Sequence, residues 1–282
     1  MRYESNFELD GVLFGDKPLL LTGWDKSASA VSAGDVACGG RLVAGYEEIG
    51  AAVWTFHLAT TATKGSLAAA FADLQVLGEK WRSPGESVLR HKIGDKWYRI
   101  YGRVRDFGGH VGNPIYAHGI IETSCVFVQL DPVFYGNEQT VDVGLVPSEV
   151  GGIMPGDAPP WVWATSSAEL SRVLRVGGNV AAPVSVTFFG PVNNPKVTVG
   201  GCVIELVGGL AYDVSVTVDS RARTCLYGGA RSGSAAGLLA PKVRLADMRV
   251  PANRNHNVVF GGIDPTGTAR CRVSVTDSFV GI

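Results

Sequence analysis

Alternating apolar and polar residues dominate the second half of the chain. Tyr212, Val214, Val216 and Val218 keep a strict period of two, which is typical of a strand with one buried face and one wet face. The same kind of pattern predicts further strands over residues 184–188, 196–199, 202–207, 224–227, 257–260 and 270–276. No helix fits this region, and we expect an antiparallel β-sandwich.

A helical pattern interrupts the β-type patterns of the first half. Over residues 64–81, apolar side chains fall at three- and four-residue intervals, at Leu67, Phe71, Leu74, Leu77 and Trp81. This spacing predicts one amphipathic helix whose apolar stripe covers a sheet. We expect the helix to end at Ser83-Pro84-Gly85, because proline cannot continue a helix and glycine readily takes left-handed backbone angles.

A β-hairpin is predicted directly after this helix. Residues 87–93 and 96–105 alternate apolar and polar side chains on either side of Gly94-Asp95, a short connection of the kind that joins paired strands. Another strand is expected within residues 115–129. Strands, one helix, a hairpin and more strands predict an α+β first domain in a mainly β chain.

The periodic patterns stop between residues 136 and 171. Prolines recur here among glycines and acidic residues, at Pro147, Pro155, Pro159 and Pro160. The sequence therefore predicts an extended, protease-sensitive linker over 136–171, between a first domain (1–135) and a second domain (172–282). Trp161 and Trp163 share one face of an extended segment; they either anchor the linker against a domain or form a sugar-stacking platform.

The composition indicates a folded protein and excludes several classes. Among 282 residues, 46% are hydrophobic and 18% are charged, so the chain can bury enough apolar surface to fold. The net charge is -1 with scattered cations, which argues against tight nucleic-acid binding. The start carries Glu4, Glu8 and Asp10, and apolar stretches fall well short of the ~20 residues of a membrane-spanning helix. We expect a soluble protein without an export signal.

The cysteines are widely spaced and include no Cys-x-x-Cys pair. They are Cys38, Cys125, Cys202, Cys225 and Cys271, and most lie in apolar, strand-like runs. This placement predicts buried free thiols rather than a metal site. Free thiols suit assembly in a reducing cytoplasm.

No motif that carries catalysis is present in the sequence. The phosphate-binding loop, the dinucleotide-binding glycine pattern and the nucleophile elbow of hydrolases are all missing. His91, His110 and His118 could still converge on neighbouring strands to hold a metal, but ordinary surface or core histidines are the favoured interpretation. Glu47 and Glu48 are adjacent and would point to opposite faces of a strand. We therefore predict that the chain is not an enzyme and has no catalytic, cofactor-binding or metal-binding residues and no cofactor.

Short motifs follow one another in a recognisable order. Leu130-Asp131-Pro132-Val133-Phe134-Tyr135-Gly136 is followed by Val-Gly-Gly-Asn at 176–179, Pro-Val-Ser-Val at 183–186 and Phe-Gly-Pro-Val-Asn-Asn-Pro at 189–195. In order and spacing, this series resembles the distal tail protein family of siphoviruses, which are tailed bacteriophages. Residues 7–11, 209–214, 218–221 and 245–260 resemble further parts of that family. The chain departs from the family at Pro251-Ala252-Asn253, where the family has Pro-Gly-Asn. This difference affects the expected geometry of one turn and not the expected fold.

The resemblance implies an architecture and a function. The expected fold is a tail-tube-like β-sandwich or split barrel with one helix, followed by a galectin-like antiparallel β-sandwich. The expected protein is a structural, minor tail protein of the virion that forms a hexameric ring between the tail tube and the tail tip or baseplate. Its implied partners are further copies of itself, the tail tube protein, the tail hub (tail-associated) protein and the tape measure protein. DNA would pass through the lumen without sequence-specific binding, and assembly would take place in the host cytoplasm.

Two other functions can be set beside this one. A receptor- or carbohydrate-binding tail module is suggested by the sandwich and by Trp161 and Trp163, although similarity to galectins does not by itself carry over sugar binding. A glycoside-cleaving tail enzyme would need two carboxylates facing each other across a cleft. The acidic residues are dispersed along the chain and offer no clustered candidates.

Overall fold

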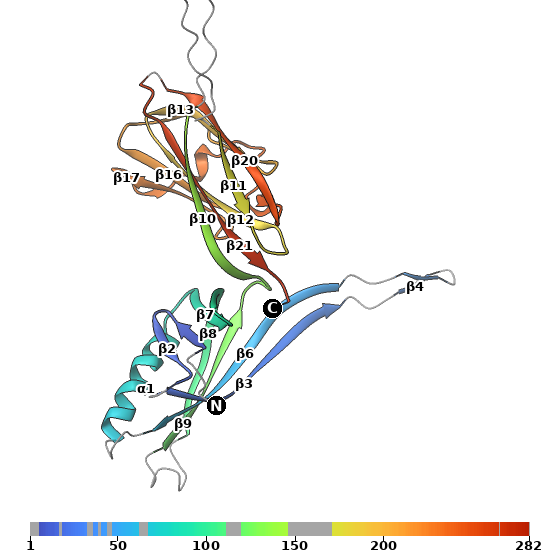
Figure 1. The fold of residues 1–282 in the computed structure, drawn as a ribbon, viewed down its shortest axis with the longest axis vertical. Helices are drawn as coiled ribbons and strands as arrows, with labels where there is room; N and C mark the ends of the chain where they lie inside the picture. The colour runs from blue at the N-terminus through green and yellow to red at the C-terminus, as the bar shows by residue number, and fades with distance from the viewer. Residues whose placement is uncertain are drawn as a thin grey trace, which may run out of the picture. The chain divides into compact units, whose positions relative to one another are not determined.

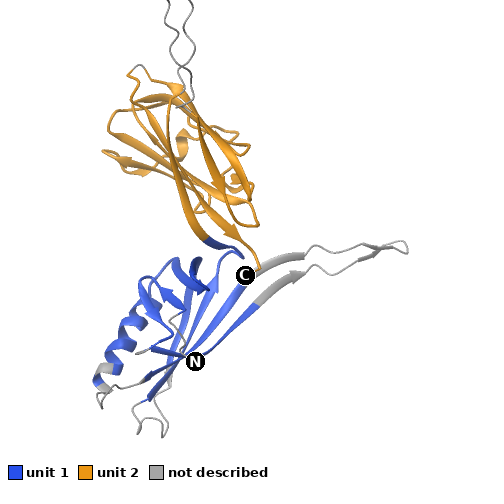
Figure 2. Ribbon diagram, in the orientation of Figure 1, with its two compact units in different colours: residues 1–135, 282 blue, residues 136–281 orange. Residues whose placement is uncertain are grey.

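The chain folds into two compact units. A computed structural model describes residues 6–16, 19–32, 36–38, 41–43, 47–61, 67–110, 120–145, 171–264 and 266–281. The first unit is Met1–Tyr135 together with Ile282, and the second is Gly136–Gly281, drawn in blue and orange in Figure 2. The chain is mainly β, as predicted, with a single α-helix among the described residues (Figure 1).

One antiparallel sheet forms the framework of the first unit. Its strands are, in order across the sheet, β2 (Val12–Phe14), β1 (Phe7–Leu9), β7 (Ser87–Ile93), β8 (Lys96–His110), β9 (Ile120–Gln129), β6 (Glu47–Thr61) and β3 (Leu19–Ser32). β3 and β6 form a long hairpin, and β4 (Val36–Cys38) pairs with β5 (Arg41–Val43) between them in the chain (Figure 1). A single bridge, between Gly15 and Leu20, joins the two ends of this order. The sheet therefore curls without closing into a barrel.

The predicted hairpin is present as β7 and β8. Ile93 lies opposite Lys96, so only Gly94 and Asp95 form the turn. Gly94 has a φ of 60°, a left-handed conformation that glycine adopts without the steric cost of a Cβ. The short connection fixes the register of both strands.

The predicted helix is present as α1 (Leu67–Trp81). Leu74, Leu77 and Trp81 are buried as expected, but Phe71 is 39% exposed, and Ala70 is buried instead. The apolar stripe is therefore narrower at its start than the spacing predicted. The helix ends before Pro84, and Gly85 takes a φ of 106°. No described helix is long and apolar enough to cross a membrane.

Two antiparallel sheets pack face to face in the second unit, which confirms the predicted sandwich. One sheet has the order β10 (Phe134–Gly144), β21 (Arg270–Phe279), β12 (Ala182–Phe189), β16 (Val214–Asp219), β17 (Thr224–Gly229), β18 (Gly233–Ser234); the other has the order β11 (Ser171–Val176), β20 (Arg254–Ile263), β13 (Val192–Val199), β14 (Cys202–Glu205). Short elements β15 (Gly209–Leu210), η4 (Ala236–Leu238), η5 (Leu245–Asp247) and β19 (Arg249–Val250) complete the unit. The rings of Phe188 and Phe260 meet between the sheets with centroids 6.0 Å apart.

The first part of the predicted linker is a strand. β10 begins at Phe134, pairs Tyr135 with Arg99 of β8 and continues to Gly144 beside β21. Val143 on this strand is buried in the core of the second unit, and Asp142 pairs with Arg272 of β21 at 2.8 Å. The linker prediction was wrong for residues 136–144 because consecutive polar residues, Asn137 to Thr140, hid the alternation. Residues 146–170, with Trp161 and Trp163, lie outside the described part of the chain.

The strand predicted from Tyr212 begins two residues later. β16 starts at Val214, and the side chain of Tyr212 is 78% exposed. The backbone between β15 and β16 forms a turn, in which the N–H of Val214 donates to the carbonyl of Ala211 at 3.2 Å. The period-two spacing of Tyr212 with the following valines is therefore coincidental.

The departing motif Pro251-Ala252-Asn253 still forms a tight turn. Asn253 has a φ of 55°, and asparagine is among the residues that tolerate this left-handed region. Nε2 of His256 lies 2.8 Å from the carbonyl oxygen of Pro251. Asparagine at this position thus supplies the backbone conformation that the turn needs.

Candidate functional site

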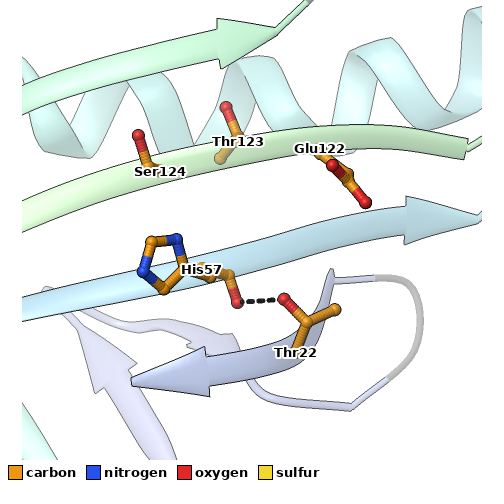
Figure 3. A pocket seen from close by; sticks show the side chains of 5 residues that line it. All are labelled: Thr22, His57, Glu122, Thr123 and Ser124. Carbon is orange, nitrogen blue, oxygen red and sulfur yellow. Dashed lines mark hydrogen bonds between the residues drawn. The ribbon is translucent and has the colours of Figure 1, made fainter. Parts of the chain in front are cut away.

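A polar hollow lies on the face of the first unit's sheet that is opposite the buried aromatic side chains. It measures about 420 Å³ and is lined by Thr22, His57, Glu122, Thr123 and Ser124 (Figure 3). Strand alternation places His57 on the outer face, because Phe56 and Leu58 on either side of it point into the core. Thr123 belongs to the buried alternation of β9, and its hydroxyl donates to the carbonyl of Gly108 at 2.9 Å. His57 lies opposite both Gly23 of β3 and Ser124 of β9 in the sheet register.

A bulge in β3 brings Thr22 to the rim of the hollow. The register of β3 against β6 shifts between Leu21 and Gly23, which leaves Thr22 as the extra residue. Its hydroxyl donates to the backbone carbonyl of His57 at 3.0 Å (Figure 3). This bond holds the backbone at the rim of the hollow. It involves the backbone carbonyl of His57 and not its imidazole.

The side chains of the hollow are not arranged for nucleophilic catalysis. Activation of a serine requires a hydrogen bond from its hydroxyl to a base, and no hydrogen bond among the described residues joins Ser124, His57 and Glu122. The described part of the chain also contains no group of three or more His, Cys, Asp or Glu side chains that could hold a metal. The hollow offers hydrogen-bonding groups to a polar partner. Its residues come from three strands, and no pattern in the sequence predicted that they would lie together.

The histidines considered for a metal site are only partly described. His91 lies in an aromatic cluster, where its ring stacks on Phe7 with centroids 4.3 Å apart. The side chain of His110 and all of His118 lie outside what the structure describes. The structure therefore places His91 in this partly buried aromatic cluster and brings no described metal ligand to it.

The cysteines of the described sheets are free thiols. Cys125, Cys225 and Cys271 are buried, and Cys202 is half-buried. Burial raises the pKa of all four thiols, because the thiolate would lose its hydration. The three buried cysteines act as small apolar groups of the core, whereas the thiol of Cys202 donates to the carbonyl of Arg249 at 3.2 Å. The side chain of Cys38 lies outside the described part.

The outer edge of β3 is a long stretch of backbone with little pairing among the described residues of the first unit. β3 pairs with β6 from Leu19 to Ser32, and on its other side only the bridge from Leu20 to Gly15 is present among the described residues. β6 is paired with β9 only from Val53 onward. Free N–H and C=O groups along such edges can pair with a strand of another chain. The hairpin of β3 and β6 is therefore suited to pairing with a strand of another chain.

The fold, a curled antiparallel sheet with one helix followed by an antiparallel sandwich, is that of phage tail hub and baseplate proteins of known structure. The SPP1 Dit (gp 19.1) protein matches 98% of this chain and 99% of its own, with a TM-score of 0.58 and 12% identity. A chain of the phage P2 baseplate in its activated conformation with Ca matches 95% of this chain and 97% of its own, with a TM-score of 0.58 and 10% identity. The same baseplate with Sr gives a TM-score of 0.55 and 11% identity over the same shares. No family model and no curated protein matches the sequence.

Proposed function

We propose that this protein is a structural component of a bacteriophage tail, a distal tail protein that forms a ring at the end of the tail tube. The observation that carries the proposal is the likeness of fold to SPP1 Dit, which extends over 98% of this chain and 99% of that one. A likeness of both units in one chain, in the same order, is more specific than a shared β-sandwich alone. The SPP1 protein is described as a paradigm of the hub adsorption apparatus in phages that infect Gram-positive hosts.

The ring is proposed to contain six copies, with contacts formed chiefly by the first unit. The copy number comes from the family resemblance, and the free edge of β3 supplies a physical reason for assembly. A repeated head-to-tail contact closes into a ring when its rotation is a whole fraction of a turn, and otherwise it builds an open filament. The net charge of -1 suits a lumen that passes DNA, because a strongly basic wall would release counterions and retain the DNA. The tail tube, tail hub and tape measure proteins are the proposed neighbours.

Purified full-length protein tests the ring directly. Native mass spectrometry and negative-stain electron microscopy at increasing concentration should show a single closed species of six subunits. The same measurements in 1 M salt are the control for nonspecific charge contacts, because edge pairing and apolar burial survive screening. A chain that stays monomeric both alone and after mixing with its tail neighbours, or that forms open fibres, would contradict the proposal.

A further inference from the structure

An aromatic cluster closes the seam between the two ends of the first unit's sheet. Phe7 of β1 and His91 of β7 stack at 4.3 Å with their planes 10° apart. Trp24 of β3 approaches both rings edge-on, at 5.8 Å from Phe7 and 5.9 Å from His91. Trp54 of β6 completes the enclosure, 5.8 Å from His91. The imidazole is therefore held between strands that are far apart in the order of the sheet.

The environment of His91 suits a neutral imidazole. Nδ1 is buried and has no hydrogen-bond partner among the described residues. Lys26 of β3 lies over the rings of Trp54 and Phe134, at 5.0 and 4.5 Å from their centroids. Burial and Lys26 are the causes that act on His91, and no carboxylate of the described residues is among them.

The remaining neighbours of His91 do not offset Lys26. Glu8 of β1 points to the other face of the sheet and pairs with Arg90 at 3.0 Å. Tyr98 lies opposite His91 in the register of β8, and β6 contributes only the uncharged Trp54. Lys92, which follows His91, alternates to the opposite face. Lys26 is the charged group that acts on the imidazole.

We propose that His91 is a pH-dependent latch, whose neutral ring holds β1 and β7 against β3 and whose protonation loosens this seam. An imidazolium carries an N–H at both ring nitrogens, and Nδ1 faces no acceptor. A buried donor without an acceptor is unfavourable, and Lys26 repels the added charge. Both unfavourable contributions disappear when the protonated ring leaves the cluster and reaches water. The inference concerns the first unit alone and holds whether or not a ring forms.

The sign of the pH dependence follows from proton linkage. Burial, and secondly the charge of Lys26, lower the pKa of His91 from 6.5 to about 4. The unfolded chain thus binds the proton more readily than the folded unit, so the contribution is fully present above pH 6.5 and is lost as the pH falls towards 4. Allowing for the partial exposure of the ring, the equilibrium for seam closure should fall about ten- to thirtyfold between pH 7.5 and pH 5.

Hydrogen exchange of the full chain at pH 7.5 and pH 5, corrected for intrinsic rates, tests the latch. Peptides that cover β1, β7 and the start of β3 should lose about ten- to thirtyfold in protection in the parent. His91→Phe keeps a ring beside Phe7 but cannot take a proton, so its protection should not change with pH. His57→Gln, on the opposite face of the same sheet, should behave like the parent.

A titration of the histidine ring signals by NMR provides a second measurement on the parent protein. His91 should titrate near pH 4, and Lys26→Met should move its midpoint upward because the repelling charge is gone. An imidazole that titrates at or above pH 6.5 would overturn the proposal. Equal loss of protection in the parent and His91→Phe would do the same. Where His91→Phe fails to fold, a midpoint at or above pH 6.5, or exchange of the parent that does not change with pH, would still overturn the proposal.

Discussion

Replacing Trp81 with alanine is expected to lower the free energy of unfolding of the first unit by about 3–5 kcal/mol. The indole at the end of α1 is only 3% exposed. It meets the rings of Phe14 and Phe56 edge-on, with centroids 5.9 and 6.1 Å away, and its Nε1–H donates to the carbonyl of Val126 at 3.0 Å. Truncation removes these contacts, leaves a cavity between helix and sheet, and removes the hydrogen bond to the half-buried Val126.

Denaturant titrations read by hydrogen exchange in peptides of α1 and β9 would measure this loss in the first unit separately from the second. Val76→Ala is the matched control on the same helix, because Val76 is 51% exposed and should change stability by less than about 0.5 kcal/mol. A Trp81→Ala protein as stable as the parent would show that α1 does not cover the sheet through this residue.

Gly178→Ala should destabilise the second unit by about 3–5 kcal/mol, through backbone strain and overpacking together. Gly178 has a φ of 93° and forms a bridge with Ser278 near the end of β21. A methyl group here would lie 2.8 Å from the backbone nitrogen of Ser278 and closer still to its carbonyl oxygen. The neighbouring backbone cannot move away easily, because the side chain of Asn179 bonds both the N–H and the carbonyl of Val280, at 2.8 and 2.9 Å.

Gly201→Ala separates the two contributions in this prediction. Gly201 has a similar φ of 87°, but a methyl group there would meet nothing within 4 Å. Its substitution should therefore cost only the conformational strain, about 1–2 kcal/mol. Calorimetry of the two variants and the parent gives the comparison. Equal costs at both sites would mean that the crowding against Ser278 relaxes freely and that the packing argument is wrong.

The sequence alone predicted the elements whose periodicity and end signals lie within a single short segment. The helix over Leu67–Trp81 has a three- and four-residue period and a Pro-Gly stop, and the hairpin of β7 and β8 has Gly94 at the turn. Strands β12 and β21 alternate cleanly because one face of each lies in the sandwich core. In these segments the local pattern and the tertiary environment favour the same structure.

The features that the sequence did not predict depend on contacts between segments that are far apart in the chain. β10 is held by its neighbour β21, although its residues 137–140 are polar. β11 begins at Ser171 inside the expected linker. The polar hollow depends on a bulge at Thr22 and on the pairing of β6 with β9. The surroundings of His91 exist only when β1, β3, β6 and β7 converge, which no single segment encodes.

Imaging of the assembled virus tail would show whether this protein forms the ring at the end of the tail tube. Antibody labelling of whole particles, followed by cryo-electron microscopy of the tail end, locates the protein and resolves its symmetry. We expect label at the tail tip and a closed ring coaxial with the tail tube, with this fold in each subunit. Isolated copies in the tail, or fibres that project away from the tube axis, would contradict it.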